Sequence, residues 1–289
     1  MGFLDYITHE RKYSIHTIEA YSKDLDEFSA YAGELYGLKK IQEITHFHIR
    51  SWLTEMLKNN MASSTVKRKV SSLKSFHKFL LKRNLIQSNP MDKVVAPKVK
   101  KSLPKFVDQR SLNELIDSIQ FDASNIKSVQ DRLILLVFYH TGIRRAELIN
   151  LKEKDVDLLT SSLKVMGKGG KERIIPFSSE LSKELRVYFD LKKKVTDSIY
   201  VFSNKKGGKL YPKYVYNAVN QFLQVVGSAS QKSPHILRHS FATNLLNNGA
   251  DINAIKELLG HASLNATQIY TQNSIEELKS IHKLTHPKS

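Results

Sequence analysis

The stretch that decides how this 289-residue chain is interpreted is residues 233–239, which read Ser-Pro-His-Ile-Leu-Arg-His. Serine is a favoured helix cap and proline is favoured at the first helical position, so the stretch predicts a helix that begins at Pro234. On that helix His235, Arg238 and His239 share one face. A helix start attracts anions through its free backbone N–H groups, and a guanidinium with two imidazoles strengthens the attraction. The stretch therefore predicts a phosphate site, although each histidine by itself is more often structural than catalytic.

The charge of the whole chain favours a polyanionic partner. Its 45 Lys and Arg residues against 28 Asp and Glu residues give a formal charge of +17. Such an excess neutralises phosphates and releases their counterions, so double-stranded DNA is the leading partner. A hydrophobic fraction of 41% and a charged fraction of 25% are typical of a globular protein.

Other features bear on location and chemistry. The longest apolar run, residues 133–138, is too short to span a bilayer, and the first residues have no signal-peptide pattern. No membrane association is expected. The chain has no cysteine, which excludes disulfides, thiolate zinc sites and cysteine nucleophiles together. These features favour a cytoplasmic location.

Residues 1–92 are predicted to form an N-terminal helical bundle. A short helix over residues 4–11 precedes three longer patterns that begin at Ser14, at Thr45 and at residues 63–64, and the first of them ends near Gly33 or Gly37. The apolar residues of the three patterns, in chain order, are Ile15, Ile18, Leu25, Phe28 and Leu35, then Phe47, Trp52, Leu53, Met56 and Leu57, then Val66, Val70, Leu73, Phe76 and Leu80. Their helical spacing predicts a small core to which these residues contribute.

A basic surface is predicted on the third helix and on the segment after it. Between Lys58 and Lys105 the chain has thirteen Lys or Arg residues and a single acidic residue, Asp92. A merely solvated helix face usually mixes acidic with basic residues, so this imbalance favours contact with DNA. The candidate DNA-binding residues are Lys67, Arg68, Lys74, Lys78 and Lys82, and the four lysines lie on one helix face.

Residues 93–108 are predicted to link two domains, because three prolines, Pro90, Pro97 and Pro104, punctuate a Lys-rich segment that cannot sustain a helix. Residues 109–289 form the second domain, mostly helical with a small antiparallel sheet. Its predicted strands are residues 162–166 and 172–177, which flank a Gly-rich turn, with residues 156–159 as a third strand and residues 199–202 as a short extended piece. Its predicted helices begin at Ser111, at Asp131, at Ser178 or Ser179, at Pro212, and near Pro234, Asp251, Leu264 and Ser274.

Further candidate residues follow the same chain order. Arg144 follows Thr-Gly-Ile at the end of an apolar helix, with Glu147 three residues later, and by itself this pair reads as a capping or surface ion pair. Lys168 lies in the hairpin turn between glycines, where Lys171 is its rival and where lysines are usually only solvated. His261 follows Gly260 at a helix end, and Tyr270 comes nine residues later. A tyrosine hydroxyl with a pKa near 10 needs a base or nearby cations before it can attack a phosphodiester.

The order of these pieces resembles the tyrosine recombinases. Thr-Gly-Ile-Arg, Gly-Lys-Gly in a hairpin, His-Ile-Leu-Arg-His, Leu-Gly-His and Tyr-Thr follow one another as they do in bacterial Xer-type recombinases and related phage-type integrases. The resemblance covers nearly the whole chain and implies a SAM-like, core-binding N-terminal bundle followed by an α+β catalytic domain. Arg145, Ala146 and Gln272 depart from the common pattern, but none of these positions carries a catalytic group.

The resemblance implies a role for each matched residue. Arg144 and Arg238 would bind the non-bridging phosphate oxygens, Lys168 would protonate the leaving 5′ oxygen, and Tyr270 would be the nucleophile. His235 and His261 would hydrogen-bond the phosphate or assist proton transfer. Two supporting residues complete the site, since Glu147 would brace the arginines and His239 would support them from behind. The product is a 3′-phosphotyrosyl enzyme with a free 5′ hydroxyl, formed without a metal or nucleotide cofactor.

Two alternatives stay open at this point. A type IB topoisomerase would use the same chemistry to relax DNA without site preference, and a non-catalytic DNA-binding protein would form no covalent adduct. Within the recombinases, the motifs do not distinguish a resolvase that acts in chromosome partition at cell division from an element-encoded integrase. The resemblance also implies a tetramer on two duplexes, with or without a paralogous recombinase. The C-terminal tail has a narrow apolar stripe, Ile275, Leu278, Ile281 and Leu284, which the resemblance would dock on a neighbouring protomer, whereas the plain alternative is its own domain.

Overall fold

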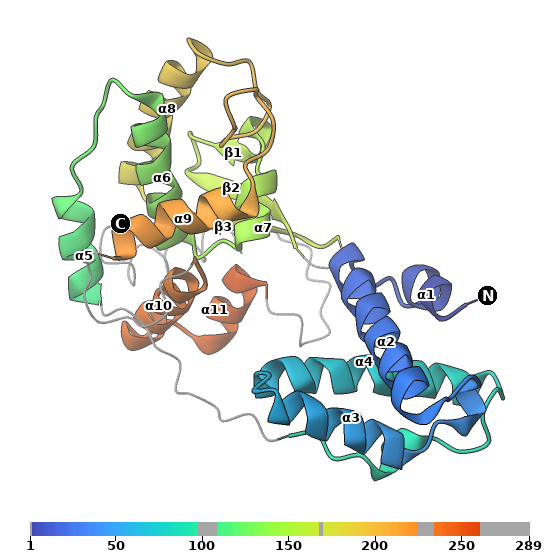
Figure 1. Ribbon diagram of the computed structural model, residues 1–289. Coiled ribbons are helices and arrows are strands. Elements are labelled where there is room, and N and C mark those ends of the chain that lie inside the picture. Colours follow the sequence, from blue (N-terminus) through green and yellow to red (C-terminus); the bar gives the residue numbers. More distant parts are fainter. Residues whose placement is uncertain (1, 98–108, 168–169, 225–233, 261–289) are drawn as a thin grey trace. The chain divides into compact units, whose positions relative to one another are not determined.

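The computed structural model describes residues 2–97, 109–167, 170–224 and 234–260 of the chain. The chain forms two compact units, Met1–Ser102 and Leu103–Ser289, called here the N-terminal and C-terminal units. Figure 1 shows helices in both units and one small sheet in the C-terminal unit. The predicted fold class, mainly helical with a small antiparallel sheet, is confirmed. None of the described helices is long and apolar enough to cross a membrane.

The N-terminal unit is built from three long helices and several short turns. Its elements are α1 (Phe3–Asp5), a π-helical turn (Tyr6–Glu10), α2 (Ile15–Tyr36), a 3-10 turn (Ile41–Glu43), α3 (His46–Lys58), α4 (Ser63–Lys82) and a 3-10 turn (Pro90–Lys93).

Local sequence sets the bounds of α2. The hydroxyl of Ser14 accepts a hydrogen bond from the backbone N–H of Thr17 at 3.3 Å, which caps the helix as predicted. The helix runs through Gly33 and ends at Gly37, whose φ of 66° is the left-handed conformation that glycine adopts at a helix end. Gly37 is therefore the correct choice between the two predicted ends.

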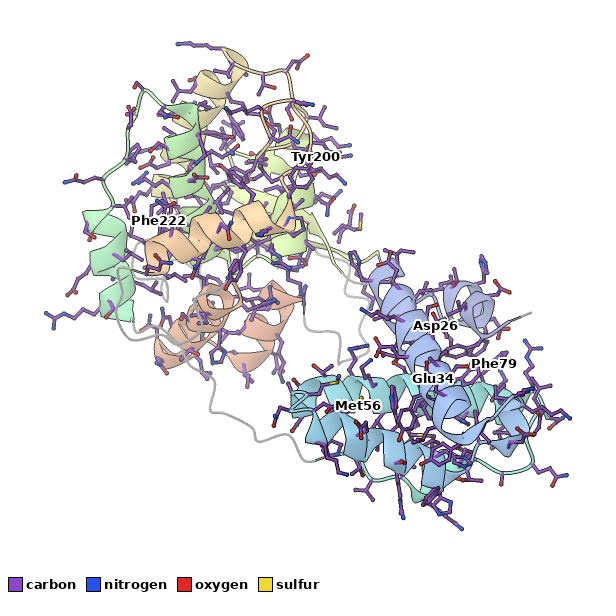
Figure 2. The ribbon with its side chains drawn as sticks, viewed as in Figure 1. Asp26, Glu34, Met56, Phe79, Tyr200 and Phe222 are labelled. Atoms are coloured by element: carbon purple, nitrogen blue, oxygen red, sulfur yellow. The ribbon has the colours of Figure 1, made fainter. Side chains whose placement is uncertain are left out.

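The main core of the N-terminal unit lies where α2, α3 and α4 meet. Phe28, Trp52, Met56, Val66 and Leu73 are buried there, whereas Phe79 is buried in a second cluster with Phe3 and Ile7; Met56 and Phe79 are labelled in Figure 2. The apolar patterns overestimate this core, because each helix buries only the turns that another element covers. The apolar residues of the predicted patterns that are instead exposed are Ile15 (62%), Leu35 (58%), Phe47 (61%) and Leu57 (43%), and Phe76 is only half-buried.

The C-terminal unit combines seven helices among its described residues with one three-stranded sheet. Its elements are α5 (Gln109–Ser118), α6 (Ile126–Thr141), α7 (Arg145–Asn150), a 3-10 turn (Glu153–Asp155), β1 (Val156–Asp157), β2 (Ser162–Met166), β3 (Glu172–Pro176), α8 (Ser179–Lys193), α9 (Pro212–Leu223), α10 (Pro234–Asn247) and α11 (Ile252–Leu259).

The sheet has the order β1-β2-β3 and is antiparallel throughout. Leu163 pairs with Ile175, and Val165 pairs with Arg173, so these side chains share the buried face of the hairpin. The predicted hairpin is confirmed, whereas the first strand is shorter than residues 156–159. The predicted extended piece at residues 199–202 adds no strand to the sheet and makes only an isolated bridge between Lys152 and Tyr200.

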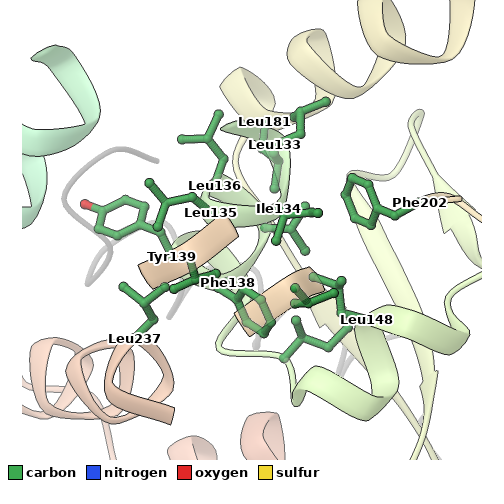
Figure 3. Packing of buried hydrophobic residues seen from close by; sticks show 14 of the residues in the cluster. Leu133, Ile134, Leu135, Leu136, Phe138, Tyr139, Leu148, Leu181, Phe202 and Leu237 are labelled. Atoms are coloured by element: carbon green, nitrogen blue, oxygen red, sulfur yellow. The ribbon is translucent and has the colours of Figure 1, made fainter. Parts of the chain in front are cut away.

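Helix α6 is the centre of the C-terminal unit. Figure 3 shows its Leu133, Ile134 and Phe138 surrounded by residues of other elements, among them Leu181 and Phe202. Burial on all sides explains why the helix is apolar without a break over residues 133–139.

Two helix starts in this unit were predicted wrongly. Helix α6 begins at Ile126, capped by the Asn125 side chain, and not at Asp131, because Asn125 accepts a hydrogen bond from the N–H of Lys127 at 3.0 Å. Ser111 lies inside α5 rather than at its cap. The predicted helices near Leu264 and Ser274 lie outside the described residues.

Helices α10 and α11 form a small apolar cluster of their own. Phe241, Leu245, Ile255 and Leu258 are buried in it. Helix α10 also packs against α6, and α11 packs against β3. This arrangement brings the end of α11 next to the end of α6, where the predicted arginines lie.

Candidate active site

Arg144 is placed by a sharp turn at the end of α6. Gly142 ends that helix with a φ of 58°, Ile143 is fully buried, and Arg144 is the cap residue of α7. The backbone N–H of Arg144 and its Nη1 each donate a hydrogen bond of 2.8 Å to the carboxylate of Glu147. The motif Thr-Gly-Ile-Arg thus anchors the backbone on both sides of the turn and leaves the Arg144 side chain about one-third exposed.

Arg238 reaches the same place from α10. Its Nη1 donates to the carbonyl of Gly142 at 2.6 Å, and its Nη2 donates to the carbonyl of Leu259 at 2.5 Å. Arg144 in turn donates from Nη2 to the carbonyl of Gly260 at 2.8 Å. The structure therefore brings together the two arginines that are ninety-four positions apart in the sequence.

A third arginine, Arg173 in β3, was missed in the sequence. Its side chain is 4% exposed, and its Nη1 and Nη2 each donate a hydrogen bond of 2.8 Å to one oxygen of Glu147. Its Nε donates to the carbonyl of Leu258 at 2.8 Å. The sequence nevertheless contained a signal. Side chains of a strand alternate between its two faces, so Arg173 lies on the same buried face as Ile175, and a charge there needs a buried partner.

The three arginines, Arg144, Arg173 and Arg238, are called here the arginine cluster. Each binds one of three consecutive carbonyls, residues 258–260, at the C-terminal end of α11. The last carbonyls of a helix have no partner within it and carry the negative end of the helix dipole, so they attract cations. The end of α11 therefore holds all three guanidiniums together, and His261 is the next residue of the chain.

The electrostatics of the cluster follow from its burial. Burial alone would raise the pKa of Glu147, but the hydrogen bonds and charge of Arg173, followed by the hydrogen bonds of Arg144, outweigh it and lower that pKa to about 2. Burial, then the charges of Arg144 and Arg173, lower the pKa of Arg238 to about 10. Around pH 7 the cluster is thus three cations with one anion.

His235 and His239 share the face of α10 that carries Arg238, as their spacing predicts. His235 lies in the first turn and is exposed, whereas His239 is half-buried. Lys168, His261 and Tyr270 lie outside the described residues. The hairpin that carries Lys168 is closed by a hydrogen bond of 2.7 Å from the N–H of Gly167 to the carbonyl of Lys171, and the rival Lys171 is exposed.

The predicted basic face on α4 is present in the N-terminal unit. Lys67, Arg68, Lys74, Lys78 and Lys82 are all exposed. They differ in one respect, because the guanidinium of Arg68 also forms an ion pair with the buried carboxylate of Asp24.

One cavity in the C-terminal unit is lined by residues outside the arginine cluster. It measures about 680 Å³ and lies between α6, α8 and α9, with Tyr188, Lys192 and Tyr214 in its wall. Within the part of the chain that the structure describes, no group of three or more His, Asp or Glu side chains could hold a metal ion. The cluster reaches the surface through Arg144, whose side chain is about one-third exposed, so a phosphate on a polymer can approach it there.

Two family models match the chain. The model described as the phage integrase family matches residues 105–277, and the model described as the phage integrase N-terminal SAM-like domain matches residues 1–84. Together they span both units.

Curated relatives match over almost the full length. The chain is 36% identical to tyrosine recombinase XerC of Bacillus subtilis over 293 residues, which cover 99% of this chain and 95% of that protein. It is 37% identical to tyrosine recombinase XerC of Listeria innocua, over 99% of this chain and 97% of that protein. The chain therefore belongs to the phage integrase family. It is a site-specific tyrosine recombinase, an enzyme that cleaves and rejoins DNA strands.

Solved structures have the same fold. The XerH recombinase in its post-cleavage complex with difH substrate superposes with a TM-score of 0.73 at 24% identity, covering 93% of this chain and 80% of that chain. The Tn1549 transposon integrase bound to circular intermediate DNA superposes with a TM-score of 0.70 at 18% identity, covering 95% and 96%. Neither alternative, the topoisomerase or the non-catalytic binder, is favoured by these comparisons.

Proposed function

We propose that this recombinase cleaves DNA by attack of Tyr270 on a backbone phosphate that Arg144 and Arg238 hold. The observation that carries the proposal is the convergence of these two guanidiniums on the end of α11, where both keep one edge bonded to backbone carbonyls. A guanidinium has five donors, so hydrogen atoms stay free to bind the non-bridging oxygens of a phosphodiester. Hydrogen bonds and charge placed in advance are the main way in which proteins stabilise such a transition state.

The proposed step exchanges one phosphate ester for another. The phenol oxygen of Tyr270 bonds to phosphorus while the bond from phosphorus to the 5′ oxygen breaks. Lys168 gives a proton to the leaving 5′ oxygen, and the phenol proton passes to a base, for which His235 and His261 are the candidates. The product is a 3′-phosphotyrosyl bond and a free 5′ hydroxyl. Rejoining reverses the step and needs no cofactor, because the energy of the original phosphodiester is kept in the new ester.

Two residues have supporting roles in this proposal. Glu147 braces Arg144, since its carboxylate accepts hydrogen bonds from both the backbone and the side chain of that residue. His239 directly follows Arg238 in α10, one turn after His235, and its half-buried side chain would support the arginine from behind.

The test of the nucleophile is a covalent adduct. The wild-type chain, Tyr270→Phe and the control Tyr211→Phe, whose target is 72% exposed, are incubated with a library of nicked duplexes of random sequence. Wild type and Tyr211→Phe should form an adduct that resists denaturation, mapped by peptide sequencing to residue 270, while Tyr270→Phe binds DNA and forms none. Adducts with Tyr270→Phe would contradict the proposal. Enrichment of one sequence among the adducts would distinguish a recombinase from a topoisomerase.

The proposed substrate is a double-stranded recombination site. Support comes from the exposed lysines of α4, residues 67, 74, 78 and 82, which form a stripe without acidic residues in the same helix. A DNA partner of this kind supports a cytoplasmic location, which is part of the proposal. The biological role that fits is integration of DNA or resolution of chromosome or plasmid dimers.

The proposed assembly is four protomers on two duplexes, of one kind or with a paralogous recombinase. The apolar spacing of Ile275, Leu278, Ile281 and Leu284 in the tail sequence supports it, because the short helix that this spacing predicts would need another surface to be stable, and a neighbouring protomer can provide one. A chain that ends at Asn273 should bind a single half-site normally and fill two half-sites without cooperativity. Unchanged cooperativity with a lower melting temperature of the free protein would mean that the tail packs on its own domain.

A further inference from the structure

We propose that Arg173 is a positioning residue that neutralises Glu147 and thereby leaves Arg144 and Arg238 cationic for the DNA phosphate. The inference rests on the proposed function and adds a residue to it. Arg173 itself is buried and would not touch DNA.

The geometry of the Arg173–Glu147 pair is bidentate. Two parallel hydrogen bonds of 2.8 Å join the guanidinium to both carboxylate oxygens, and the two side chains are 4% and 5% exposed. This is the strongest arrangement available to an arginine and a carboxylate. Arg144 reaches Glu147 with one side-chain hydrogen bond at one oxygen, so Glu147 interacts more completely with Arg173 than with Arg144.

The Arg173–Glu147 pair determines how much net positive charge the site has for a phosphate. Glu147 is the only carboxylate that bonds to the arginine cluster among the described residues, so the cluster has three positive charges and one negative charge. Two net charges face a phosphodiester of charge −1. Without Arg173, the charge of Glu147 would oppose Arg144 alone, and the net positive charge would fall by half. In a half-buried site, where water screens little, such a loss weakens anion binding strongly.

Arg173 also fixes the position of the site. Its Nε holds the carbonyl of Leu258, so β3 and the end of α11 are tied through one side chain. A Cβ atom added to Gly260 would lie 3.2 Å from both Cδ and Nη1 of Arg173, so glycine is what lets the chain pass this close. The hairpin that carries Lys168 and the residue before His261 are thus held by the same guanidinium.

The alternative is that Arg173 only cross-links the fold. The experiment that separates the two compares Arg173→Gln, Glu147→Gln/Arg173→Gln and Arg173→Lys with wild type, as single-turnover rates of covalent adduct formation on a nicked duplex that wild type cleaves. Rates are expressed as ratios to wild type between about pH 5.5 and about pH 8.5, near and above the usual histidine range. Far-UV circular dichroism checks that each variant is folded.

The proposal expects Arg173→Gln to cleave about 100-fold more slowly than wild type at the upper pH, as much as the loss of one direct donor to the phosphate, because half of the net positive charge is lost. Its ratio should recover as the pH falls, because a buried Glu147 without Arg173 has a raised pKa and takes up a proton. The double variant, which has no carboxylate, should cleave faster than Arg173→Gln at the upper pH, without the acid recovery. Arg173→Lys, which keeps the charge, should lie between Arg173→Gln and wild type.

The proposal would be overturned if the rate of Arg173→Gln relative to wild type is the same at every pH and the double variant cleaves no faster than Arg173→Gln. Arg173 would then only cross-link the fold. If Arg173→Gln does not fold, an Arg173→Lys variant that is folded and as slow as the double variant would overturn it too. Absence of an adduct with wild type would instead contradict the proposed function, so the two failures are distinguishable.

Discussion

The carboxylate of Asp24, in the middle of α2, is fully buried and accepts a hydrogen bond of 3.0 Å from the ammonium of Lys69 in α4. The same carboxylate accepts a hydrogen bond of 2.6 Å from the hydroxyl of Ser72 and forms an ion pair with the guanidinium of Arg68. Lys69 lies in the basic helix of the N-terminal unit, yet it faces the core, with its ammonium 5.5 Å from the centre of the Trp52 ring. The basic residues of α4 therefore have two roles, since some face outward and Lys69 connects two helices.

Asp24→Asn should destabilise the N-terminal unit by roughly 3–5 kcal/mol, because it removes the buried charged partner of Lys69 and leaves that buried ammonium with only the part-exposed Glu27. The measurement is urea unfolding followed by the fluorescence of Trp52, which is the single tryptophan of the chain and lies in this unit. Glu27→Gln is the matched control, because Glu27 also binds Lys69 but is 41% exposed. It should cost less than about 1 kcal/mol. Equal losses for the two variants would contradict a special role of the buried carboxylate.

Lys74→Ala and Lys78→Ala should reduce the salt dependence of DNA binding. Each lysine that contacts a phosphate contributes roughly 0.9 to the slope of log affinity against log salt, so each variant should lower that slope by about this amount. Fluorescence anisotropy with a labelled duplex at several salt concentrations gives the slope. Lys40→Ala is the control, because Lys40 is exposed in the same unit but precedes α3 and lies outside the basic helix. A slope that falls equally in the control would show diffuse attraction in place of a defined face.

The sequence predicted the helices of the N-terminal unit because their caps and apolar spacing are local signals. Asp24 was not predicted, since its partners lie more than forty positions away. Even so, Asp24 precedes the buried Phe28 by four residues and Ala32 by eight, so it occupies the buried stripe of α2. A charge within an apolar stripe is a usable signal of a buried ion pair, whereas the identity of its partner depends on how the helices pack.

His77 should make the N-terminal unit less stable in mild acid. Its side chain is fully buried, Nδ1 lies 2.9 Å from the carbonyl of Leu73, and Nε2 has no hydrogen-bond partner among the described residues. Burial lowers its pKa below the usual value. As the pH falls through about 6.5 the unfolded chain takes up a proton that the folded chain refuses, so stability falls by at most about 1.4 kcal/mol per pH unit.

The measurement is the unfolding free energy by Trp52 fluorescence between about pH 7.5 and about pH 5.5, a range chosen around the usual histidine pKa. His77→Leu should remove part of the pH dependence. His16→Gln should keep it, because the His16 side chain is 90% exposed. Identical pH dependence in wild type and His77→Leu would show that His77 is not the responsible group.

Lys168→Ala should slow strand cleavage by roughly 10²- to 10⁴-fold, and Lys171→Ala much less, because only a general acid acts on the leaving 5′ oxygen in the transition state. A substrate with sulfur at that bridging position separates the roles, since sulfur leaves without a proton. Cleavage by Lys168→Ala should then largely recover. A defect that persists with sulfur would mean that Lys168 positions the phosphate.

The arginine site shows where sequence prediction of function stops. Arg144 and Arg238 could be predicted because each lies in a distinctive motif next to a helix end. Arg173 has no motif around it that points to Glu147, and its bidentate pair forms only when β3 lies beside α7. The three acceptors at residues 258–260 are backbone carbonyls, so no pattern of side chains in the sequence predicts that the arginines bind there. The contacts that hold the reacting residues in place, unlike the reacting residues themselves, therefore could not be predicted from the sequence.

The turn that presents Arg144 depends on the glycine at its first position. Gly142 and Gly37 both end helices in the left-handed conformation, with φ of 58° and 66°. Alanine at either position costs about 1–2 kcal/mol for that conformation. A Cβ at Gly37 meets nothing within 4 Å, whereas a Cβ at Gly142 would lie 2.5 Å from Cδ1 of Phe241. The carbonyl of Gly142 also binds Arg238, so any movement there disturbs the phosphate site.

Gly142→Ala should therefore reduce single-turnover cleavage by at least about 10-fold, equivalent to roughly 1.4 kcal/mol of transition-state stabilisation, while Gly37→Ala cleaves normally. Phe241→Leu removes part of the ring that the new methyl group would strike. The double variant Gly142→Ala/Phe241→Leu should then cleave faster than Gly142→Ala, even though Phe241→Leu alone loses apolar packing. If the second substitution gives no recovery while circular dichroism shows both proteins folded, the contact with Phe241 is not the cause, and the left-handed backbone at Gly142 alone accounts for the loss.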